Sequence, residues 1–197
     1  PLIPEFSNED LVKLYKAGEN SYVKNSFTTV QEGKTDLATL EELPKIAAET
    51  GLNIDVISYP DLKVLKDHPK LHGEMMSHEY QNRFRLGGDK LTLDGSPQGK
   101  TAWFTEPYLV PPAGQSKTYA GYPAFGDTEA IALMRQAYDN GWQLLVHTNG
   151  DAAVDQLIRL VDVIKAERNI GDHRTVMIHG QFTRQDQITR LKDAGIF

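Results

Sequence analysis

The sequence of 197 residues contains no cysteine. The chain can therefore form no disulfide, no cysteine-ligated zinc site and no thiol nucleophile. Any metal ion must instead be held by histidine, by carboxylates or by a modified lysine.

Other absences narrow the class of protein further. No apolar run reaches the length needed to cross a bilayer, which disfavours a membrane protein. The net charge of −6 disfavours a nucleic-acid groove or an anionic membrane surface as partner. Neither GxGxxG nor GxxxxGK[ST] occurs, so a doubly wound nucleotide-binding domain is the weaker alternative. The compartment stays undecided, with the cytoplasm slightly favoured over the periplasm.

The sequence contains a repeated pattern of strand, loop and helix. It recurs about five times at a spacing of roughly 30 residues, which is typical of βα units in a parallel sheet. Such units form either a closed (β/α)₈ barrel or an open sheet. A complete barrel needs about 250 residues, so the fold class predicted here is α/β, a partial TIM-type barrel.

The two ends of the chain favour a piece of a longer protein. The chain starts at Pro1 without an initiator methionine, and residues 193–197 read as a helix stop followed by a new strand. We expect residues 1–197 to be the central part of one catalytic barrel domain, truncated at both ends. Because an incomplete barrel exposes apolar strand edges, association into a homo-oligomer is expected.

Local signals locate the elements. Helices are expected to start near capping residues or glycine, at Ser7, Asp36, Asp127, Gly150 and Thr183. Strands are expected over 27–30, 54–57, 90–93, 142–146 and 175–178. Residues 61–71 have an ambiguous pattern that is compatible with a helix but is interrupted by Pro69. Residues 99–126 form a long irregular stretch, of the kind that is usually functional or disordered.

Two consecutive βα units end their strands with histidine. The runs 144–146 and 176–178 are β-prone, and they are followed by His147 and His179. The carboxyl ends of neighbouring parallel strands lie side by side, so the two imidazoles could share one metal ion. The alternative is that each histidine merely caps its strand.

Lys90 begins a β-prone run one unit earlier. A buried ammonium is costly unless it is paired or neutralised, so an edge lysine that reaches solvent is the alternative. Asp94, at the end of this run, could position substrate or support a metal ligand, or could form an Asx turn. Asp151 could serve in the same way, or as a first-turn helix carboxylate favoured by the helix dipole.

Two weaker sets of candidates remain. His68 and His72 have the spacing of a helical metal pair, but Pro69 disrupts that geometry and favours exposed histidines, and His78 lies in the same stretch. The aromatic residues of the long loop could line a substrate pocket or cover the barrel mouth: Trp103, Phe104, Tyr108, Tyr119 and Tyr122.

Together these segments resemble a known family. The segments that carry the resemblance are Lys90–Ser96 followed by Thr101-Ala102, His147–Ala153, Ile178–Gln181 and, upstream, Phe27–Val30. They resemble amidohydrolase family 3 of the amidohydrolase superfamily, which includes N-substituted formamide deformylases and their YtcJ-like relatives. The resemblance runs from about Tyr22 to Phe197.

The resemblance implies a metal-dependent hydrolase with a TIM-type barrel and one or two divalent ions, usually zinc. It implies that Lys90 is carboxylated by CO₂ and bridges two ions, and that His147 and His179 bind the second ion. The implied reaction is hydrolysis of a non-peptide C–N amide bond in a small-molecule substrate by a metal-activated water.

The chain also departs from the family pattern. The superfamily has an H-x-H pair on strand one and an aspartate on strand eight, and this sequence supplies neither. We therefore expect the isolated chain to bind metal weakly and to lack turnover. A non-catalytic barrel fragment or binding module without metal is the alternative function.

Overall fold

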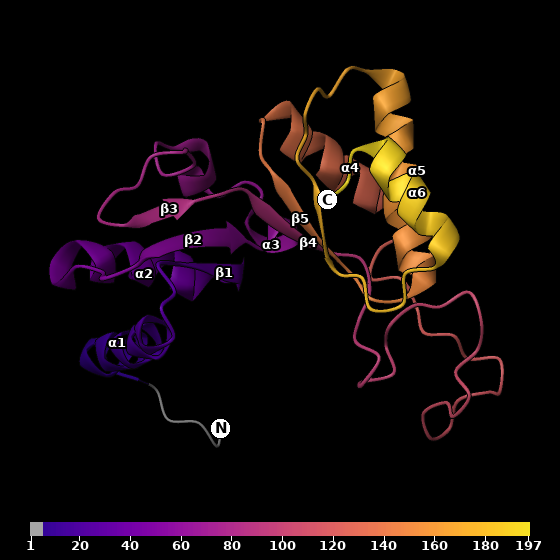
Figure 1. The fold of residues 1–197 in the computed structure, drawn as a ribbon, viewed down its shortest axis with the longest axis horizontal. Coiled ribbons are helices and arrows are strands. Elements are labelled where there is room, and N and C mark those ends of the chain that lie inside the picture. Colours follow the sequence, from indigo (N-terminus) through magenta and orange to yellow (C-terminus); the bar gives the residue numbers. More distant parts are fainter. Residues whose placement is uncertain (1–5) are drawn as a thin grey trace. The chain divides into compact units, whose positions relative to one another are not determined.

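The structure is a computed structural model that describes residues 6–197 (Figure 1). The described residues divide into two compact units. The first unit comprises residues 6–60 and 67–87, and the second comprises residues 61–66 and 88–197.

The first unit is built around a three-stranded parallel sheet in the order β1-β2-β3. The predicted caps of its two long helices are confirmed. The Ser7 hydroxyl accepts the Asp10 amide, and the Asp36 carboxylate accepts the Thr39 amide. Gly51 ends the second helix with a φ of 66°, a backbone conformation that favours glycine. The elements in chain order are α1 (Asn8–Lys24), β1 (Thr29–Thr35), α2 (Leu37–Thr50), β2 (Asp55–Pro60), the 3₁₀ turn η1 (Pro69–His72) and β3 (Phe84–Leu86).

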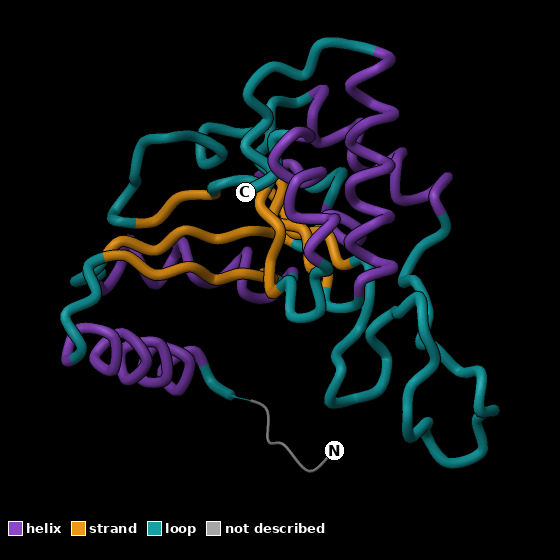
Figure 2. Tube along the Cα trace, turned by 45° about the vertical axis from the view of Figure 1, so that its right-hand side comes forward, coloured by secondary structure: helices purple, strands orange, loops and turns teal. Residues whose placement is uncertain are grey.

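The second unit is built around another three-stranded parallel sheet, in the order β4-β5-β6. Helix α5 packs against β5 and contacts α4 and α6. Figure 2 shows these helices gathered on one side of the strands. The elements in chain order are α3 (Leu62–Leu65), β4 (Asp89–Thr92), α4 (Asp127–Asp139), β5 (Leu144–Thr148), α5 (Asp151–Glu167), β6 (Val176–His179) and α6 (Gln185–Ala194).

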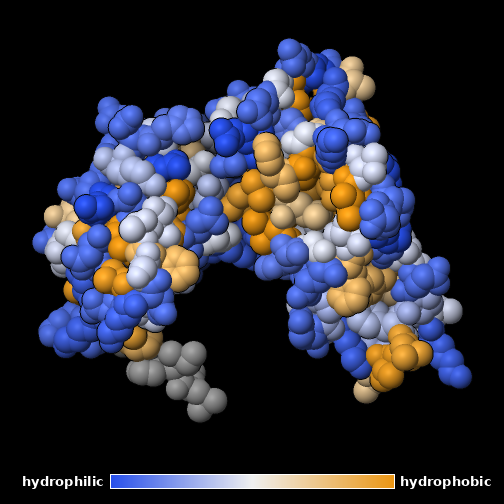
Figure 3. Space-filling model, in the orientation of Figure 1, coloured by the Kyte–Doolittle hydropathy of each residue, from blue (hydrophilic) through white to orange (hydrophobic). Residues whose placement is uncertain are grey.

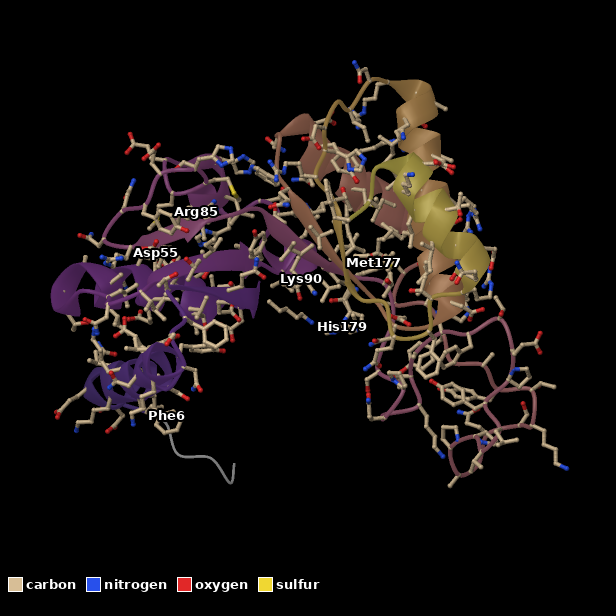
Figure 4. The ribbon with its side chains drawn as sticks, in the orientation of Figure 1. Phe6, Asp55, Arg85, Lys90, Met177 and His179 are labelled. Carbon is tan, nitrogen blue, oxygen red and sulfur yellow. The ribbon has the colours of Figure 1, made fainter. Side chains whose placement is uncertain are left out.

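Helix α5 forms the centre of the second unit's core. Its apolar residues recur at helical spacing, and the stripe predicted from that spacing is at most 2% exposed. This stripe consists of Val154, Leu157, Leu160, Val161 and Ile164. Apolar side chains also gather over the β4–β6 sheet in the view of Figure 3, where Met177 of β6 lies (Figure 4). Burial of this stripe fixes α5, and with it the end of β5 that precedes the helix.

The long loop between β4 and α4 is irregular, as expected, but it is internally bonded. The Tyr108 hydroxyl donates to the Ala102 carbonyl at 2.9 Å, and the Tyr119 hydroxyl donates to the Lys100 carbonyl at 2.7 Å. These hydrogen bonds from tyrosine hydroxyls to backbone carbonyls hold the loop together in place of regular backbone–backbone pairing. At its tip Leu109 is 99% exposed.

Several element boundaries differ from the sequence expectation. The strand β3 was not expected, and residues 61–71 contain only the short helix α3 and the start of η1. Asp127 is the first residue of α4 rather than its cap, because its carboxylate accepts from Gln156 and Arg159 instead. Thr183 does not cap α6; its hydroxyl donates to the Gly180 carbonyl.

The α/β class with parallel sheets is confirmed. Within residues 6–197 the strands form two separate three-stranded sheets, so barrel closure is not observed there and the partial barrel stays a prediction. The assignment of the whole chain to one catalytic domain likewise stays a prediction. Among these residues, no helix combines the length and apolarity needed to span a membrane.

Candidate metal centre

The predicted site residues lie on neighbouring strands: Lys90 is the second residue of β4, whereas His147 and His179 lie at the carboxyl ends of β5 and β6. Lys90 pairs with Leu145, and two residues later Thr92 pairs with His147. Residues paired in register on parallel strands point to the same face, and alternate residues share a face. Lys90 and His147 therefore belong to one face of the sheet.

Lys90 lies inside the second unit rather than at an exposed edge. It is 5% exposed, pairs with β5 on one side and forms a parallel bridge with Asp61 on the other. The alternative of an edge lysine that reaches solvent is therefore wrong. Figure 4 shows Lys90 and His179 in the same part of the unit, and the charge of Lys90 acts on His179.

The two histidine rings are in contact. Their centroids are 4.6 Å apart with an interplanar angle of 78°. Sheet register alone does not produce this contact, because His147 pairs with Ile178 whereas His179 pairs with Thr148 on the opposite face. His179 has a φ of 77°, so the strand ends there in a left-handed turn. A non-glycine residue in this conformation is strained, and such strain is concentrated at functional sites.

His147 is oriented by acceptors around its Nε2 atom. Nε2 lies 2.9 Å from the Gly95 carbonyl oxygen and 3.5 Å from the Asp94 carboxylate. The Asn149 amide nitrogen lies 3.1 Å from the same Nε2 atom, so a carbonyl, a carboxylate and a side-chain amide all contact this side of the ring. The Asn149 amide nitrogen also donates to the Gly95 carbonyl, at 2.9 Å. These contacts fix the orientation of the His147 ring.

Asp94 joins three backbone segments around the site. Its side chain is fully buried. The carboxylate accepts the amides of Asn149 at 2.9 Å, Gly150 at 2.8 Å and Trp103 at 3.0 Å. It therefore holds the loop after β4 against the turn that carries His147. The Asx-turn alternative does not describe these contacts, because all three donors are distant in sequence.

Asp151 lies at the start of α5 and contacts other loops rather than the histidines. Its carboxylate accepts the Thr105 amide at 2.9 Å and the Arg184 guanidinium at 2.6 Å. Burial raises the pKa of this carboxyl, but the hydrogen bonds from Thr105 and the Arg184 charge together bring the pKa below its usual value. Asp151 is thus a buried anion that ties two loops to the first turn of α5.

The electrostatics of His179 suit a metal ligand. Partial desolvation lowers the pKa of His179, and the neighbouring His147 and Lys90 lower it further. Only neutral imidazole binds a metal, so this shift favours the ligand form. Within residues 6–197, no three histidine, aspartate or glutamate side chains converge as a metal cluster. The donor chemistry therefore fits a two-histidine site that needs Lys90 or a further ligand to complete it.

The other histidine candidates lie in the first unit. His68 Nδ1 accepts the Lys70 amide at 3.3 Å, and Nε2 lies 3.1 Å from Glu41. These contacts give His68 a structural role beside η1. His78 is exposed.

The aromatic residues of the long loop form a cluster, partly with a residue that the sequence did not indicate. Phe104 packs edge-on against Tyr108 and against Phe182, three residues after His179. The functional candidates missed from sequence are Asn149 beside His147 and Arg184 beside Asp151. Their roles depend on tertiary contacts, and only the position of Asn149, two residues after a strand-end histidine, gave a signal.

The fold is similar to solved structures of hydrolases. Two are described as uncharacterized metal-dependent hydrolases, from Pyrococcus horikoshii OT3 and Pyrococcus furiosus. Each has a TM-score of 0.76, with 23% and 22% identity, and the match covers 97% of this chain and 36% and 38% of those chains. A Xaa-Pro dipeptidase with methionine bound in its active site has a TM-score of 0.54 and 17% identity, covering 99% of this chain and 47% of its own.

The chain therefore spans less than half the length of each of these proteins. No curated protein matches it. The family described as the amidohydrolase family matches residues 2–197, nearly the whole sequence. On this match, the chain belongs to the amidohydrolase family.

Proposed function

We propose that this chain is part of a metal-dependent hydrolase that cleaves non-peptide C–N bonds of the amide type in a small molecule. Family membership and the fold support hydrolase chemistry in general. The observation that carries the proposal is the pair of imidazole rings in contact, beside a buried lysine, at the ends of adjacent parallel strands.

In this proposal Lys90, His147 and His179 hold a divalent ion, and zinc is favoured because imidazole nitrogen is one of its usual ligands. When bound, such an ion lowers the pKa of a water and polarises a substrate carbonyl. The chain contributes orientation. The Gly95 carbonyl and Asp94 hold the ring of His147, and the left-handed turn at His179 brings the second ring against the first.

The proposed ligand form of Lys90 is a carbamate. The neutral lysine amine attacks the carbon of CO₂; an N–C bond forms, one C=O π bond opens and the nitrogen releases a proton, so a neutral amine becomes an anionic oxygen donor. The burial of Lys90 favours this change, because a buried ammonium is costly. The carbamate would complete the donor set that the two histidines leave unfinished.

The test is metal content and amide hydrolysis in the longer protein that contains this chain. His147→Asn and His179→Asn should each lower bound zinc by at least about tenfold and abolish hydrolysis. His78→Asn is the control, because His78 is exposed in the first unit, and it should change neither. Unchanged metal content in both site variants would contradict the proposal and favour a barrel that holds no metal.

A further inference from the structure

Arg184 is the centre of an ion-pair network at the start of α6. Its guanidinium donates to Asp151 at 2.6 Å, to Asp155 at 2.9 Å and to Asp186 at 3.1 Å. The three carboxylates come from the first turn of α5, its second turn and α6 itself. A planar guanidinium with five donors can satisfy all three at once, which a lysine ammonium cannot do in the same geometry.

Asp151 relays this network to the long loop after β4. One carboxylate oxygen accepts the Thr105 amide at 2.9 Å, and the other accepts both the Thr105 hydroxyl and Arg184. Three loops therefore meet at one buried carboxylate: the loop after β4, the turn after β5 and the loop after β6. These are the segments that come after Lys90, His147 and His179.

A second, apolar contact joins the same two outer loops. Phe104, which precedes Thr105, packs edge-on against Phe182 with ring centroids 4.9 Å apart. The Phe182 amide also donates to the Asn149 carbonyl at 3.0 Å. The ionic and aromatic contacts thus attach the segment between His179 and Arg184 at two neighbouring points.

This attachment matters because His179 has a strained backbone. A left-handed non-glycine residue is strained and persists only where its surroundings fix it. The strand before His179 holds it on one side. On the other side the chain is held by the Gly180 amide, which donates to Thr148, and five residues on by Arg184.

We propose that Arg184 is a positioning residue of the candidate metal centre: through Asp151 it fixes the loop that carries His179 against the loop that comes after Lys90. The inference rests on the proposed function for its metal readout, but the loop contact itself does not depend on a metal. Arg184 touches neither histidine, so its effect is transmitted by Asp151 and Thr105.

The chain supplies a matched control in Arg190. Arg190 lies on α6, the first residue of which follows Arg184 directly; it is of comparable exposure and donates to Asp155 at 2.6 Å. It makes no contact with Asp151 in the part of the chain that the structure describes. Comparing Arg184→Gln with Arg190→Gln therefore separates the link to Asp151 from the loss of an arginine that pairs with Asp155.

The experiment is a calorimetric titration, with zinc ions, of the longer protein that contains this chain, together with hydrogen exchange of the Thr105 amide. Arg184→Gln should weaken zinc binding about tenfold and speed exchange at Thr105. Arg190→Gln should change zinc binding by less than about twofold, as expected for an exposed ion pair. Arg184→Lys should restore only part of the exchange protection.

Thr105→Val tests the link from its other end and keeps the ion pairs of Arg184 intact. It should reproduce the direction of the Arg184→Gln effect on zinc binding. Equal zinc affinity and equal Thr105 exchange in Arg184→Gln and Arg190→Gln would overturn the inference. Absence of zinc binding in the unmodified longer protein would count against the proposed function, and the exchange comparison would still decide whether Arg184 fixes the loop.

Discussion

The two units of this chain share one construction and differ in the residues at the ends of their strands. Each has three parallel strands with helices packed nearby. In the first unit the strands end at Thr35, Pro60 and Leu86, residues with no metal-binding chemistry. In the second, β5 and β6 lead to His147 and His179, and β4 starts with a buried aspartate and lysine. The parallel-strand scaffold is common to both units, and the proposed metal ligands lie in the second.

The units also differ in how closely their loops approach. In the second unit a Cβ added to Gly150 would lie 1.9 Å from the Trp103 carbonyl oxygen, and one added to Gly121 would lie 1.8 Å from that of Ala102. In the first unit, a Cβ on Gly33 would meet nothing within 4 Å. Backbone segments in the second unit are thus packed against each other around the site, which preorganises side chains that come from different loops.

The largest expected difference is in the pH dependence of stability, and it concerns two aspartates that each begin a strand. Asp55 of β2 pairs with Arg83 at 3.0 Å, whereas Asp89 of β4 is fully buried and neither of its oxygens has a hydrogen-bond partner among the described residues. Burial raises the pKa of Asp89 from 3.8 to about 8. A raised folded-state pKa gives stability that is complete below pH 4 and is lost as the pH rises towards 8.

We therefore expect the free energy of unfolding to fall by about 1.4 kcal/mol per pH unit between pH 5 and 8 because of Asp89. Asp89→Asn should remove this slope and be more stable than the unmodified chain at pH 8. Asp55→Asn should leave the slope in place. Urea unfolding of each variant at pH 5 and pH 8 measures the slope. If Asp89→Asn has the same slope as the unmodified chain, the Asp89 carboxyl ionises normally.

The next expected effect is steric. Gly150→Ala forces a methyl group into the Trp103 backbone and should lower the free energy of unfolding by about 3 kcal/mol. Gly33→Ala, in open space on β1, should change it by less than about 1 kcal/mol. Equal urea midpoints for the two variants would mean that the loops around Gly150 move apart easily.

A smaller effect is expected from two carboxylates that accept backbone amides. Asp94→Asn leaves at least one of three buried amides without an acceptor, which should cost about 1–3 kcal/mol. Asp36→Asn should be nearly neutral, because asparagine caps a helix as well as aspartate does. Thermal unfolding of both variants measures the difference in stability. Similar losses of stability would mean that Asp94 contributes no more than an ordinary helix cap.

The smallest effect is expected at His68, the histidine of the first unit that pairs with Glu41. His68→Gln should change the free energy of unfolding by less than about 0.5 kcal/mol and leave zinc binding unaltered. The measurement is a zinc titration of the variant beside His147→Asn. A loss of zinc binding in His68→Gln would transfer the metal centre to the first unit.

Much of the fold could be predicted because its signals are local. Ser7, Asp36 and Gly51 act on residues within one helical turn, and the buried stripe of α5 repeats at helical spacing. The strand β3 was missed because three residues beside two glycines carry too little periodicity. Thr183 has the residue type of a cap, but its hydroxyl is used by Gly180, a choice that local sequence does not reveal.

The site was predictable only in part, because some of its residues are defined by tertiary contacts rather than by local signals. His147 and His179 were indicated because each comes after a β-prone run, and parallel strands bring such ends together. The burial of Lys90 between β5 and Asp61 could not be read from its neighbours in sequence. Arg184, directly before α6, and Arg190, within it, look alike in sequence, and only the tertiary contact with Asp151 distinguishes them.

The backbone at His179 also bears on how far this region can be stabilised. Its φ of 77° is a conformation that glycine adopts without strain, and the next residue, Gly180, already has a φ of 55°. Replacing His179 by glycine would therefore relieve the backbone while removing one of the two imidazole rings. At this one position a gain in backbone stability and the proposed metal binding therefore oppose each other, because the residue that relieves the strain carries no imidazole.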